Sequence, residues 1–326
     1  MPVAGSAEQI RFEVMELIRG IHNLRPVHQG CVATIGNFDG VHLGHQAVLG
    51  RLAERAGELA LPSMVITFEP YPLEYFRPGQ APARLTRFRE KIQALRRFAV
   101  DRVLTLRFDA ELAAMPAEAF IRELLVDALG VRYLVVGDDF HFGAGRRGNF
   151  AMLEAAGHER GFQVVNMHTF GVDGDRVSST RIREALAAGD LAAAEKLLGR
   201  PYRMCGRVAH GDKRGRSIGF PTANIHLHRQ KTPVLGVYAV EMFGLDEEPV
   251  AGVANVGSRP TVDGTRSLLE VHLFDFSGDI YGRYVQVDFV HRLREERRFE
   301  SFEALKGQIL RDADQARAFF RERYGR

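Results

Sequence analysis

The chain has 326 residues, of which 45% are hydrophobic and 26% charged, and a formal net charge of +3. This length predicts about two domains, while the small net charge and the lack of any apolar run near the ~20 residues of a membrane span argue against nucleic-acid and membrane partners. The first fourteen residues lack the apolar core of a secretory signal, and Cys31 and Cys205 have no metal-ligand spacing, so we expect a cytoplasmic chain.

Apolar runs alternate with helical patterns from Met15 to about residue 198. Residues 1–14 show little pattern, and we expect them to be flexible or to reflect an upstream start. The expected strands are 31–36, 63–68, 102–106, 131–137 and 162–166, and the expected helices lie near 45–60, 86–99, 116–129, 149–160 and 179–198. This alternation is typical of an α/β domain with a parallel, doubly wound sheet.

The rhythm changes near Gly199–Tyr202, where short strands punctuated by Gly and Pro replace the helical spacing. We therefore expect two domains, 15–198 and 199–326. The later strands are expected at 204–209, 222–225, 237–243, 250–256, 268–274 and 285–290, with spacings typical of a small antiparallel β-barrel. A last helix, from about Ser301 to Arg323, carries an apolar face that can pack on the side of the barrel, with Ser301 as its N-cap.

The segment Thr34–His45 carries the clearest functional signal. It joins an apolar strand to a helix and contains Gly-Asn-Phe-Asp-Gly-Val-His-Leu-Gly-His. Backbone N–H groups and the helix dipole favour anions at such a turn, and its glycines let a nucleotide approach closely. His42 and His45 share one face of the first helical turn and can both donate hydrogen bonds to a triphosphate. The other nucleotide-binding residues expected in this turn are Gly36, Asn37, Phe38, Asp39 and Gly44.

A second phosphate-binding pattern, Val177–Arg183, precedes an Ala- and Leu-rich helix. Hydroxyls at a helix N-terminus can cap the helix and donate to phosphate, and Arg181 or Arg183 can make charge-assisted contacts with a triphosphate. The alternative interpretation is an ordinary N-cap beside two solvated arginines. The residues that we expect to contact the nucleotide here are Ser178, Ser179, Thr180 and Arg181.

Polar and aromatic residues also follow the expected strand 131–137, in Gly-Asp-Asp-Phe-His-Phe-Gly-Ala-Gly-Arg-Arg-Gly. Asp138 and Asp139 can hold a ribose or the polar edge of a ring, and Phe140 or Phe142 can flank an aromatic ring. A solvated glycine-rich loop is the alternative. The clustering of glycines, aromatic residues and arginines in one loop favours the binding interpretation.

These strings resemble the H-x-G-H superfamily of nucleotidylyltransferases, and Val177–Arg183 resembles its S-x-T-x-x-R motif. The longer first string resembles the adenylyltransferase half of bacterial bifunctional riboflavin kinase/FMN adenylyltransferases (FAD synthetases). The resemblance implies a Rossmann-like domain in which the FMN phosphate attacks the α-phosphorus of ATP. His42, His45 and Arg181 would then supply charge neutralisation and in-line positioning. Phe68–Pro72 matches a further family loop, in which Tyr71 stands where His is common.

The carboxyl part contains Gly211–Asn224, a Gly-rich basic flap that ends in Pro-Thr-Ala-Asn. It lacks the Walker spacing, yet such a flap can cradle phosphates. The residues expected to bind the nucleotide here are Gly211, Lys213, Gly219 and Pro221. Thr222 and Asn224, two apart on a strand, point the same way and offer hard oxygen ligands for Mg²⁺. The string Gly-Phe-Pro-Thr-Ala-Asn closely resembles the flavokinase motif.

Glu270 lies on an alternating strand and matches the proposed catalytic base of the flavokinase family. A riboflavin hydroxyl, unlike the FMN phosphate, must lose a proton before it attacks ATP, so a carboxylate is needed. Segments around Arg259 and Arg294 extend the same resemblance, which implies that both residues bind substrate or nucleotide. We interpret His272 as structural.

Together these resemblances imply a chain that makes FMN from riboflavin and FAD from FMN, using ATP and Mg²⁺ for both, as a monomer or weak oligomer. Three alternatives remain open. They are a catalytically silent flavin- or nucleotide-binding regulator, a pantetheine- or nicotinamide-type adenylyltransferase with an unrelated barrel, and an RNA-binding barrel.

Overall fold

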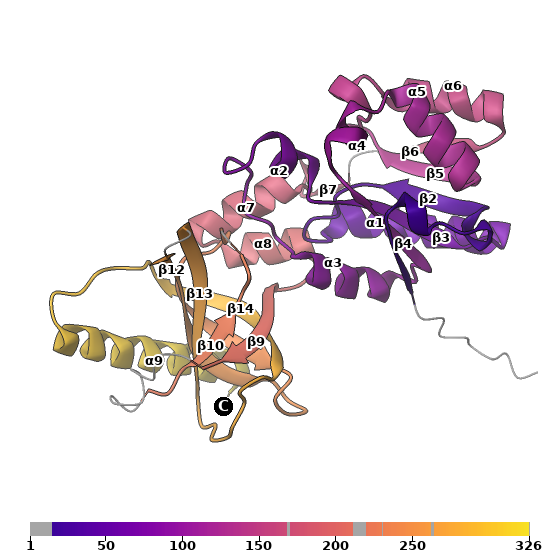
Figure 1. The fold of residues 1–326 in the computed structure, drawn as a ribbon. Helices are drawn as coiled ribbons and strands as arrows, with labels where there is room; N and C mark the ends of the chain where they lie inside the picture. The colour runs from indigo at the N-terminus through magenta and orange to yellow at the C-terminus, as the bar shows by residue number, and fades with distance from the viewer. Residues whose placement is uncertain (1–14, 168–169, 211–219, 230, 262–263, 326) are drawn as a thin grey trace, which may run out of the picture. The chain divides into compact units, whose positions relative to one another are not determined.

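The computed structural model describes residues 15–167, 170–210, 220–229, 231–261 and 264–325, with the backbone alone for 258–261 and 264–266. The expectation for residues 1–14 lies outside this range. The chain divides into two compact units (Figure 1). The first comprises Met1–Phe38, His45–Gln80 and Ile92–Thr169, and the second comprises Asp39–Gly44, Ala81–Lys91 and Phe170–Arg326.

The first unit is built on a six-stranded parallel sheet in the order β1-β4-β3-β2-β5-β6. The strands are β1 (Glu16–Arg19), β2 (Cys31–Ile35), β3 (Ser63–Glu69), β4 (Arg102–Arg107), β5 (Val131–Gly137) and β6 (Gln163–Met167). Every residue of β2 is buried, as in a strand that is covered on both faces. The five expected strands are confirmed, and the sequence reading missed β1, a four-residue strand that pairs with β4 at the edge of the sheet.

Short helical segments connect these strands. They are α1 (Leu43–Leu59), α2 (Pro72–Phe76), α3 (Phe88–Leu95), α4 (Ala110–Ala114), α5 (Ala117–Ala119) and α6 (Phe150–Arg160), with a π-helix at Phe120–Ala128 and 3₁₀ turns at Ile21–Asn23, Pro26–His28, Arg96–Phe98 and Ala144–Arg146. The helix expected at 116–129 is therefore α5 followed by the π-helix, whose Phe120 and Leu124 are buried in the core beneath the sheet strands.

The second unit contains a closed antiparallel barrel in the order β10-β13-β12-β11-β14-β9. Its strands are β9 (Tyr202–Ala209), β10 (Ala223–His226), β11 (Gly236–Phe243), β12 (Val250–Thr261), β13 (Gly264–Leu273) and β14 (Tyr284–Arg294). Alternate residues fill the interior, because successive side chains of a strand point to opposite faces. Tyr238, Val240 and Met242 of β11, for example, are fully buried in one core cluster. The expected barrel is confirmed.

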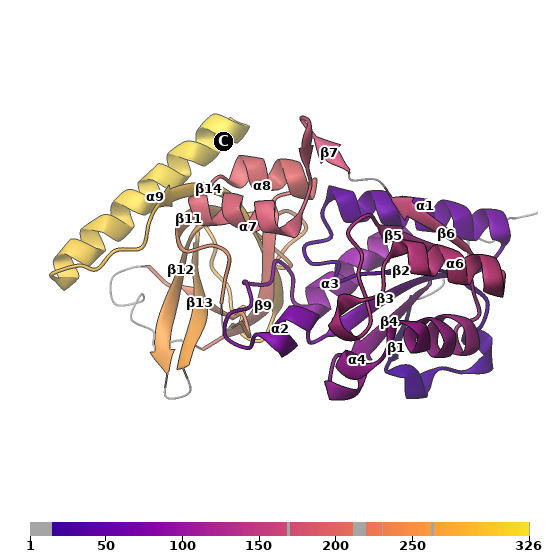
Figure 2. The same cartoon turned by 90° about the horizontal axis from the view of Figure 1, so that it is seen from above.

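Helices flank the barrel within the same unit. They are α7 (Ser179–Ala188), α8 (Leu191–Leu198) and α9 (Phe302–Tyr324), and a small hairpin of β7 (Gly171–Val172) and β8 (Asp175–Arg176) precedes them. The single helix expected at 179–198 is wrong: Gly189 ends α7 in the left-handed region and the Asp190 side chain caps α8. α9 lies along β11, β12 and β14 (Figure 2), and the Ser301 side chain caps it as expected.

Two segments from the first part of the sequence cluster with the barrel unit, namely Asp39–Gly44 and Ala81–Lys91. Leu85 is fully buried there in one apolar cluster with Ile182 of α7 and Tyr202 of β9. The compact units therefore do not follow the expected boundary at residue 198. Among the described residues, no helix combines the length and apolar character that crossing a membrane requires.

Candidate functional site

The turn after β2 lies where the strand order of the parallel sheet reverses. From β2 the sheet continues through β3 and β4 on one side and through β5 and β6 on the other. Ligands bind outside the carboxyl ends of the strands at such a switch point. Gly36–Phe38 follow β2, and Asp138–Phe140 follow its hydrogen-bonded neighbour β5. The structure thus brings these two predicted groups to the same edge of the sheet.

Phe38 and His45 pack together at this edge. Phe38 is buried with a φ of 50°, and its ring centroid lies 5.0 Å from that of His45. A Cβ atom on Gly36 would lie 3.2 Å from the Phe38 ring, so Gly36 leaves room for it. Asn37, between them, is exposed. The turn therefore combines a packed ring pair, Phe38 and His45, with a small residue, Gly36, and the exposed Asn37.

The loop after β5 presents its two acids to solvent. Asp138 and Asp139 are exposed, while Phe140 is half-buried and stacks on Phe142 at a centroid distance of 5.6 Å. Phe142 in turn contacts Phe120 of the π-helix at 5.4 Å. The aromatic residues thus hold the loop on the core, while Asp138 and Asp139 are exposed at the end of the strand.

His42 is buried in the second unit, with 6% of its surface exposed. Burial lowers the pKa of its imidazole to about 4; the Asp39 carboxylate opposes this shift, and Arg183 and Arg176 add to it. A Cβ atom on Gly44 would lie 3.3 Å from the imidazole, so Gly44 makes space for the ring. His42 is therefore uncharged at neutral pH. As a neutral imidazole it can still donate a hydrogen bond to phosphate, and its part in adenylyl transfer stays a prediction.

Asp39 lies at the centre of a hydrogen-bonded cluster and is 3% exposed. Its carboxylate accepts from the backbone N–H groups of Leu85 (3.0 Å) and Thr86 (2.9 Å), from the Thr86 hydroxyl (3.2 Å) and from Arg183 Nη2 (2.6 Å). Ser179 Oγ donates to the backbone carbonyl of Asp39 at 2.9 Å. These donors reach both carboxylate oxygens, so Asp39 holds the turn, and the contact with nucleotide expected from the sequence stays a prediction.

The two arginines of the α7 motif differ in their surroundings. Arg181 donates to Asp175 Oδ2 (2.9 Å) and to the Arg176 carbonyl (3.0 Å) at the β7–β8 hairpin. Arg183 donates through Nε to the Ala83 carbonyl (2.7 Å) and through Nη2 to Asp39. Arg183 is thus the guanidinium in the cluster with Asp39 and close enough to His42 to depress its pKa. The spacing S-x-T-x-x-R, which ends on Arg183, was the sequence signal for this residue.

The hydroxyls of the same motif are also placed. Ser178 caps α7, because its Oγ accepts from the Arg181 backbone N–H at 3.3 Å. Ser179 is half-buried against the Asp39 turn, and Thr180 is exposed. The N-terminus of α7 thus presents one exposed hydroxyl, that of Thr180, at the end of a helix where anions are favoured.

Sequence reasoning missed an aromatic cluster after β3 in the first unit. Phe76 is 59% exposed and Tyr75 37% exposed on α2, and both rings meet Phe108 edge to face, at 5.5 and 5.6 Å. Phe68, at the end of β3, contacts Phe108 from the other side at 5.9 Å. Tyr71, the residue that replaces the family's usual His, is buried at the start of α2. The sequence signal for this cluster was the pair of adjacent aromatic residues in Pro72-Leu-Glu-Tyr-Phe76. A short helix cannot bury both rings, and exposed apolar groups often mark a binding surface.

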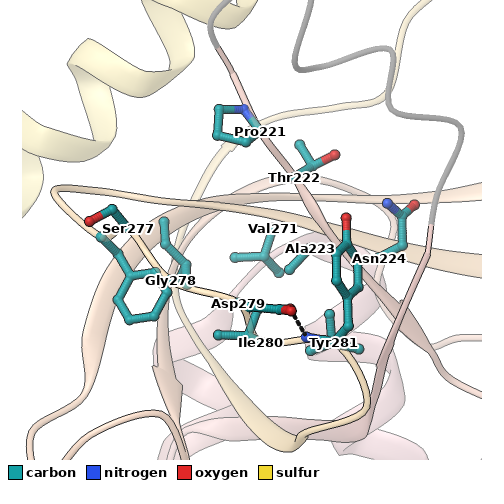
Figure 3. Close-up of a pocket in the computed structure, with 13 residues that line it drawn as sticks. Pro221, Thr222, Ala223, Asn224, Val271, Ser277, Gly278, Asp279, Ile280 and Tyr281 are labelled. Carbon is teal, nitrogen blue, oxygen red and sulfur yellow. Dashed lines mark hydrogen bonds between the residues drawn. The ribbon is translucent and has the colours of Figure 1, made fainter.

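A pocket of about 720 Å³ opens on the barrel between β10 and the Phe276–Tyr281 loop (Figure 3). Its lining is Val208, Pro221, Thr222, Ala223, Asn224, Val271, Leu273, Phe276, Ser277, Gly278, Asp279, Ile280 and Tyr281. Asp279 accepts from the Tyr281 backbone N–H at 3.0 Å, which fixes the loop, and the Tyr281 ring lies 3.8 Å from His210. The volume and the mixture of apolar walls with a few polar groups suit a small-molecule ligand.

The barrel register places the predicted base beside the predicted metal ligands. Asn224 of β10 pairs with Glu270 of β13, and Glu270 pairs with Asn255 of β12 on its other side. Side chains of directly paired residues have Cβ atoms about 5 Å apart. Glu270 therefore lies beside Asn224, which lines the pocket together with Thr222. The contacts of His272 agree with a structural role. Its ring centroid lies 4.5 Å from that of Phe220, and its Nδ1 lies 3.0 Å from the Pro221 carbonyl oxygen.

Arg294 is engaged within the protein. Its guanidinium donates to both carboxylate oxygens of Asp312 on α9, with Nε at 3.0 Å from each and Nη2 at 2.8 Å from one. Asp312 is buried, so the pair fixes α9 to the end of β14, and the contact of Arg294 with substrate or nucleotide stays a prediction. Arg259 lies on β12 opposite Arg266, and its side chain lies outside the description. Gly211, Lys213 and Gly219 also lie outside the described residues.

Comparison with known proteins covers both units. Residues 24–181 match the FAD synthetase family and residues 198–320 match the riboflavin kinase family. Bifunctional riboflavin kinase/FMN adenylyltransferases from Escherichia coli (strain K12) and Haemophilus influenzae are each 56% identical over 94% of the chain, covering 98% and 99% of those proteins. The enzyme of the same name from Pseudomonas fluorescens is 55% identical over 93% of the chain and 97% of its own length.

A solved structure also aligns over nearly the whole chain. The crystal structure of a protein named macrolide-efflux protein, from Streptococcus pneumoniae, has a TM-score of 0.79 and 31% identity, and covers 93% of this chain and 99% of that one. The two family matches follow each other along the chain, one over each predicted site, and the relatives align over nearly their whole length. These matches establish the family of the chain. The chain belongs to the family of bifunctional riboflavin kinase/FMN adenylyltransferases.

Proposed function

We propose that the chain phosphorylates riboflavin with ATP to give FMN, and then transfers the adenylyl group of ATP to FMN to give FAD and pyrophosphate. The observation that carries the proposal is the barrel register, in which the carboxylate residue Glu270 pairs with Asn224, a residue that lines the 720 Å³ pocket. A base next to hard oxygen ligands is what the phosphorylation of an alcohol needs. Both family matches support the same pair of reactions.

In the barrel, the residues divide the work between binding and proton transfer. The Thr222 hydroxyl and the Asn224 amide oxygen fit Mg²⁺, which prefers oxygen ligands and retains several waters. Bound Mg²⁺ supplies neutralisation of the charge on the ATP phosphates. Glu270 accepts the proton of the riboflavin 5′-hydroxyl while that oxygen attacks the γ-phosphorus and ADP leaves. The apolar walls, such as Val208 and Val271, exclude water from the nucleotide.

Adenylyl transfer makes a different demand on the protein. The FMN phosphate is already an anion at neutral pH, so its attack on the α-phosphorus of ATP requires positioning and charge stabilisation without a base. His42 donates a hydrogen bond as a neutral imidazole, and Arg183 supplies positive charge near it. His45 and Arg181 remain candidate phosphate ligands. Pyrophosphate leaves in line with the attacking oxygen.

The exposed aromatic cluster of Phe76, Tyr75 and Phe108 offers a place for the flavin ring of FMN. It lies at the carboxyl ends of β3 and β4, the edge of the parallel sheet at which ligands bind. A planar isoalloxazine ring can stack on or meet these rings edge to face, as aromatic pairs do at centroid distances of about 4.5–7 Å. Asp138 and Asp139 would then serve the polar parts of the nucleotide.

The decisive experiment is chromatographic separation of flavins after incubation of the purified chain with riboflavin, ATP and Mg²⁺. We expect FMN first and FAD second. Glu270→Gln should abolish FMN formation from riboflavin and leave the conversion of supplied FMN to FAD at the wild-type rate. His42→Ala should show the reverse pattern, with FAD formation lowered on the order of tenfold or more. Loss of both activities in folded Glu270→Gln would contradict the division of labour.

The same experiment separates the rival function. A catalytically silent regulator would bind flavin and nucleotide without forming FMN or FAD. Omission of Mg²⁺ tests the proposed metal requirement, and light scattering tests whether the chain is a monomer or a weak oligomer. We also propose a cytoplasmic location and a functional division at residues 15–198 and 199–326, which the family matches at 24–181 and 198–320 support.

A further inference from the structure

Thr86 belongs to no motif, yet its hydroxyl closes the turn that leads to His42. Thr86 Oγ1 accepts from the Gly40 backbone N–H at 2.9 Å and donates to Asp39 Oδ1 at 3.2 Å. Its own backbone N–H donates to the same carboxylate oxygen at 2.9 Å. Thr86 is 6% exposed, so no solvent replaces these contacts. One side chain thus fixes two consecutive residues of the turn.

The turn is held equally firmly from its other side. Arg183 Nη2 and Ser179 Oγ, both from α7, donate to the carboxylate and the carbonyl of Asp39 at 2.6 and 2.9 Å. Arg200 Nη2 donates to the Gly40 carbonyl at 2.8 Å. The Asp39 carboxylate is therefore the shared partner of Thr86 and Arg183, and a change on one side is transmitted to the other.

The segment that carries Thr86 is itself anchored to the barrel. Glu90 Oε2 accepts from Arg229 Nη2 at 2.6 Å, and Glu90 Oε1 accepts from the Cys205 backbone N–H of β9 at 3.1 Å. Arg229 Nη1 donates to the Arg84 carbonyl at 2.6 Å. Since Glu90 and Arg229 are both buried, Thr86 sits on a rigid support rather than on a mobile loop.

We propose that Thr86 and Asp39 are positioning residues for adenylyl transfer, which hold His42 and Arg183 in the arrangement that receives ATP. The proposal rests on the proposed function and deepens it. Removal of the Thr86 hydroxyl leaves the Gly40 N–H without its acceptor and weakens the hold on Asp39, so both donors can shift. A displacement of about 1 Å in positioning groups can lower a rate on the order of a hundredfold.

The test compares Thr86→Val, which keeps the shape and removes the hydroxyl, with Thr86→Ser, which keeps the hydroxyl. We expect Thr86→Val to lower kcat for FAD formation about 10- to 100-fold with little change in the KM for FMN. Thr86→Ser should keep the rate of FAD formation within about threefold of wild type. The small remaining loss is expected because serine lacks the buried methyl group of threonine. The riboflavin kinase rate of each variant is the control, because the barrel belongs to the same compact unit as Thr86.

Two results would overturn the proposal. One is a wild-type kcat for FAD formation in Thr86→Val, and the other is a Thr86→Ser variant as impaired as Thr86→Val. Should Thr86→Val lose kinase activity through misfolding, Thr86→Ala replaces it, since it removes the hydroxyl without burying another methyl group. A wild-type chain that makes no FAD would instead refute the proposed function, so the two failures are distinguishable.

Discussion

The buried ion pair of Glu90 and Arg229 offers the sharpest test of how the second unit is held together. Four donors converge on the Glu90 carboxylate: Arg229 Nη2, the Arg87 backbone N–H, Arg87 Nε and the Cys205 backbone N–H, at 2.6, 2.7, 3.1 and 3.1 Å. Each oxygen of the Glu90 carboxylate accepts two of these hydrogen bonds. Glu90→Gln replaces one oxygen with an NH₂ group, which is itself a donor and cannot accept either bond. It also leaves the guanidinium of Arg229 without a negative partner.

The magnitude follows from burial. The side chains of Arg229 and Glu90 are 3% and 5% exposed, so water cannot solvate the orphaned charge. Arg229 Nε already lacks an acceptor among the described residues, which makes the guanidinium more dependent on Glu90. Removing one partner of a buried pair costs about 3–5 kcal/mol. At about 2–4 °C per kcal/mol for a unit of this size, the midpoint of thermal unfolding should fall by about 6–20 °C.

The assay is thermal unfolding of the full chain followed by circular dichroism, with riboflavin kinase activity as a second probe of the barrel. Glu295→Gln is the matched control, because Glu295 is 84% exposed and its pair with Arg292 is a surface one at 3.3 Å. Surface pairs contribute about 0–1 kcal/mol, so the control should shift the midpoint by a few degrees at most. Equal midpoints for Glu90→Gln and Glu295→Gln would refute the reasoning.

Two further predictions concern the adenylyltransferase residues. Burial lowers the pKa of His42 from 6.5 to about 4, so the unfolded chain binds the proton first and stability is lost as pH falls from about 6.5 to about 4. In the wild type, this shift changes the free energy of unfolding by on the order of 3 kcal/mol over the pH range, and His42→Gln should remove that dependence. His158→Gln, at an exposed position, should leave it in place. Parallel curves of unfolding free energy against pH for the two variants would contradict the assignment. Phe76→Ala should weaken FMN binding about tenfold, measured by quenching of flavin fluorescence, because a stacked ring contributes about 1–3 kcal/mol. The equally exposed Phe302→Ala on α9 should leave FMN binding unchanged, and equal loss in both variants would remove the aromatic cluster from the flavin site.

Much of the architecture is written in local patterns of the chain. The continuous apolar run Cys31–Ile35 predicts a strand covered on both faces, and its residues are all buried. The alternation around Glu270 predicts a barrel strand, and Ser301 predicts the start of α9. These features depend on neighbours within a few residues, so the sequence reveals them without knowledge of the fold. The order of the motifs likewise identified the family.

Other features depend on residues that are distant in sequence and could be seen only in the tertiary structure. The motif spacing ends on Arg183, but only the tertiary structure shows that Arg183 pairs with the Asp39 carboxylate, 144 residues away in sequence. The same holds for Thr86, whose role exists only through its contacts with Asp39 and Gly40. The neutral state of His42 also follows from burial by remote segments. The sequence by itself determined which elements form and which chemistry they carry, because strand and helix periodicity and motif spacing are local. The tertiary structure decided which side chains are buried and which partners they bond to, because desolvation and hydrogen-bond saturation are set by groups that folding brings together.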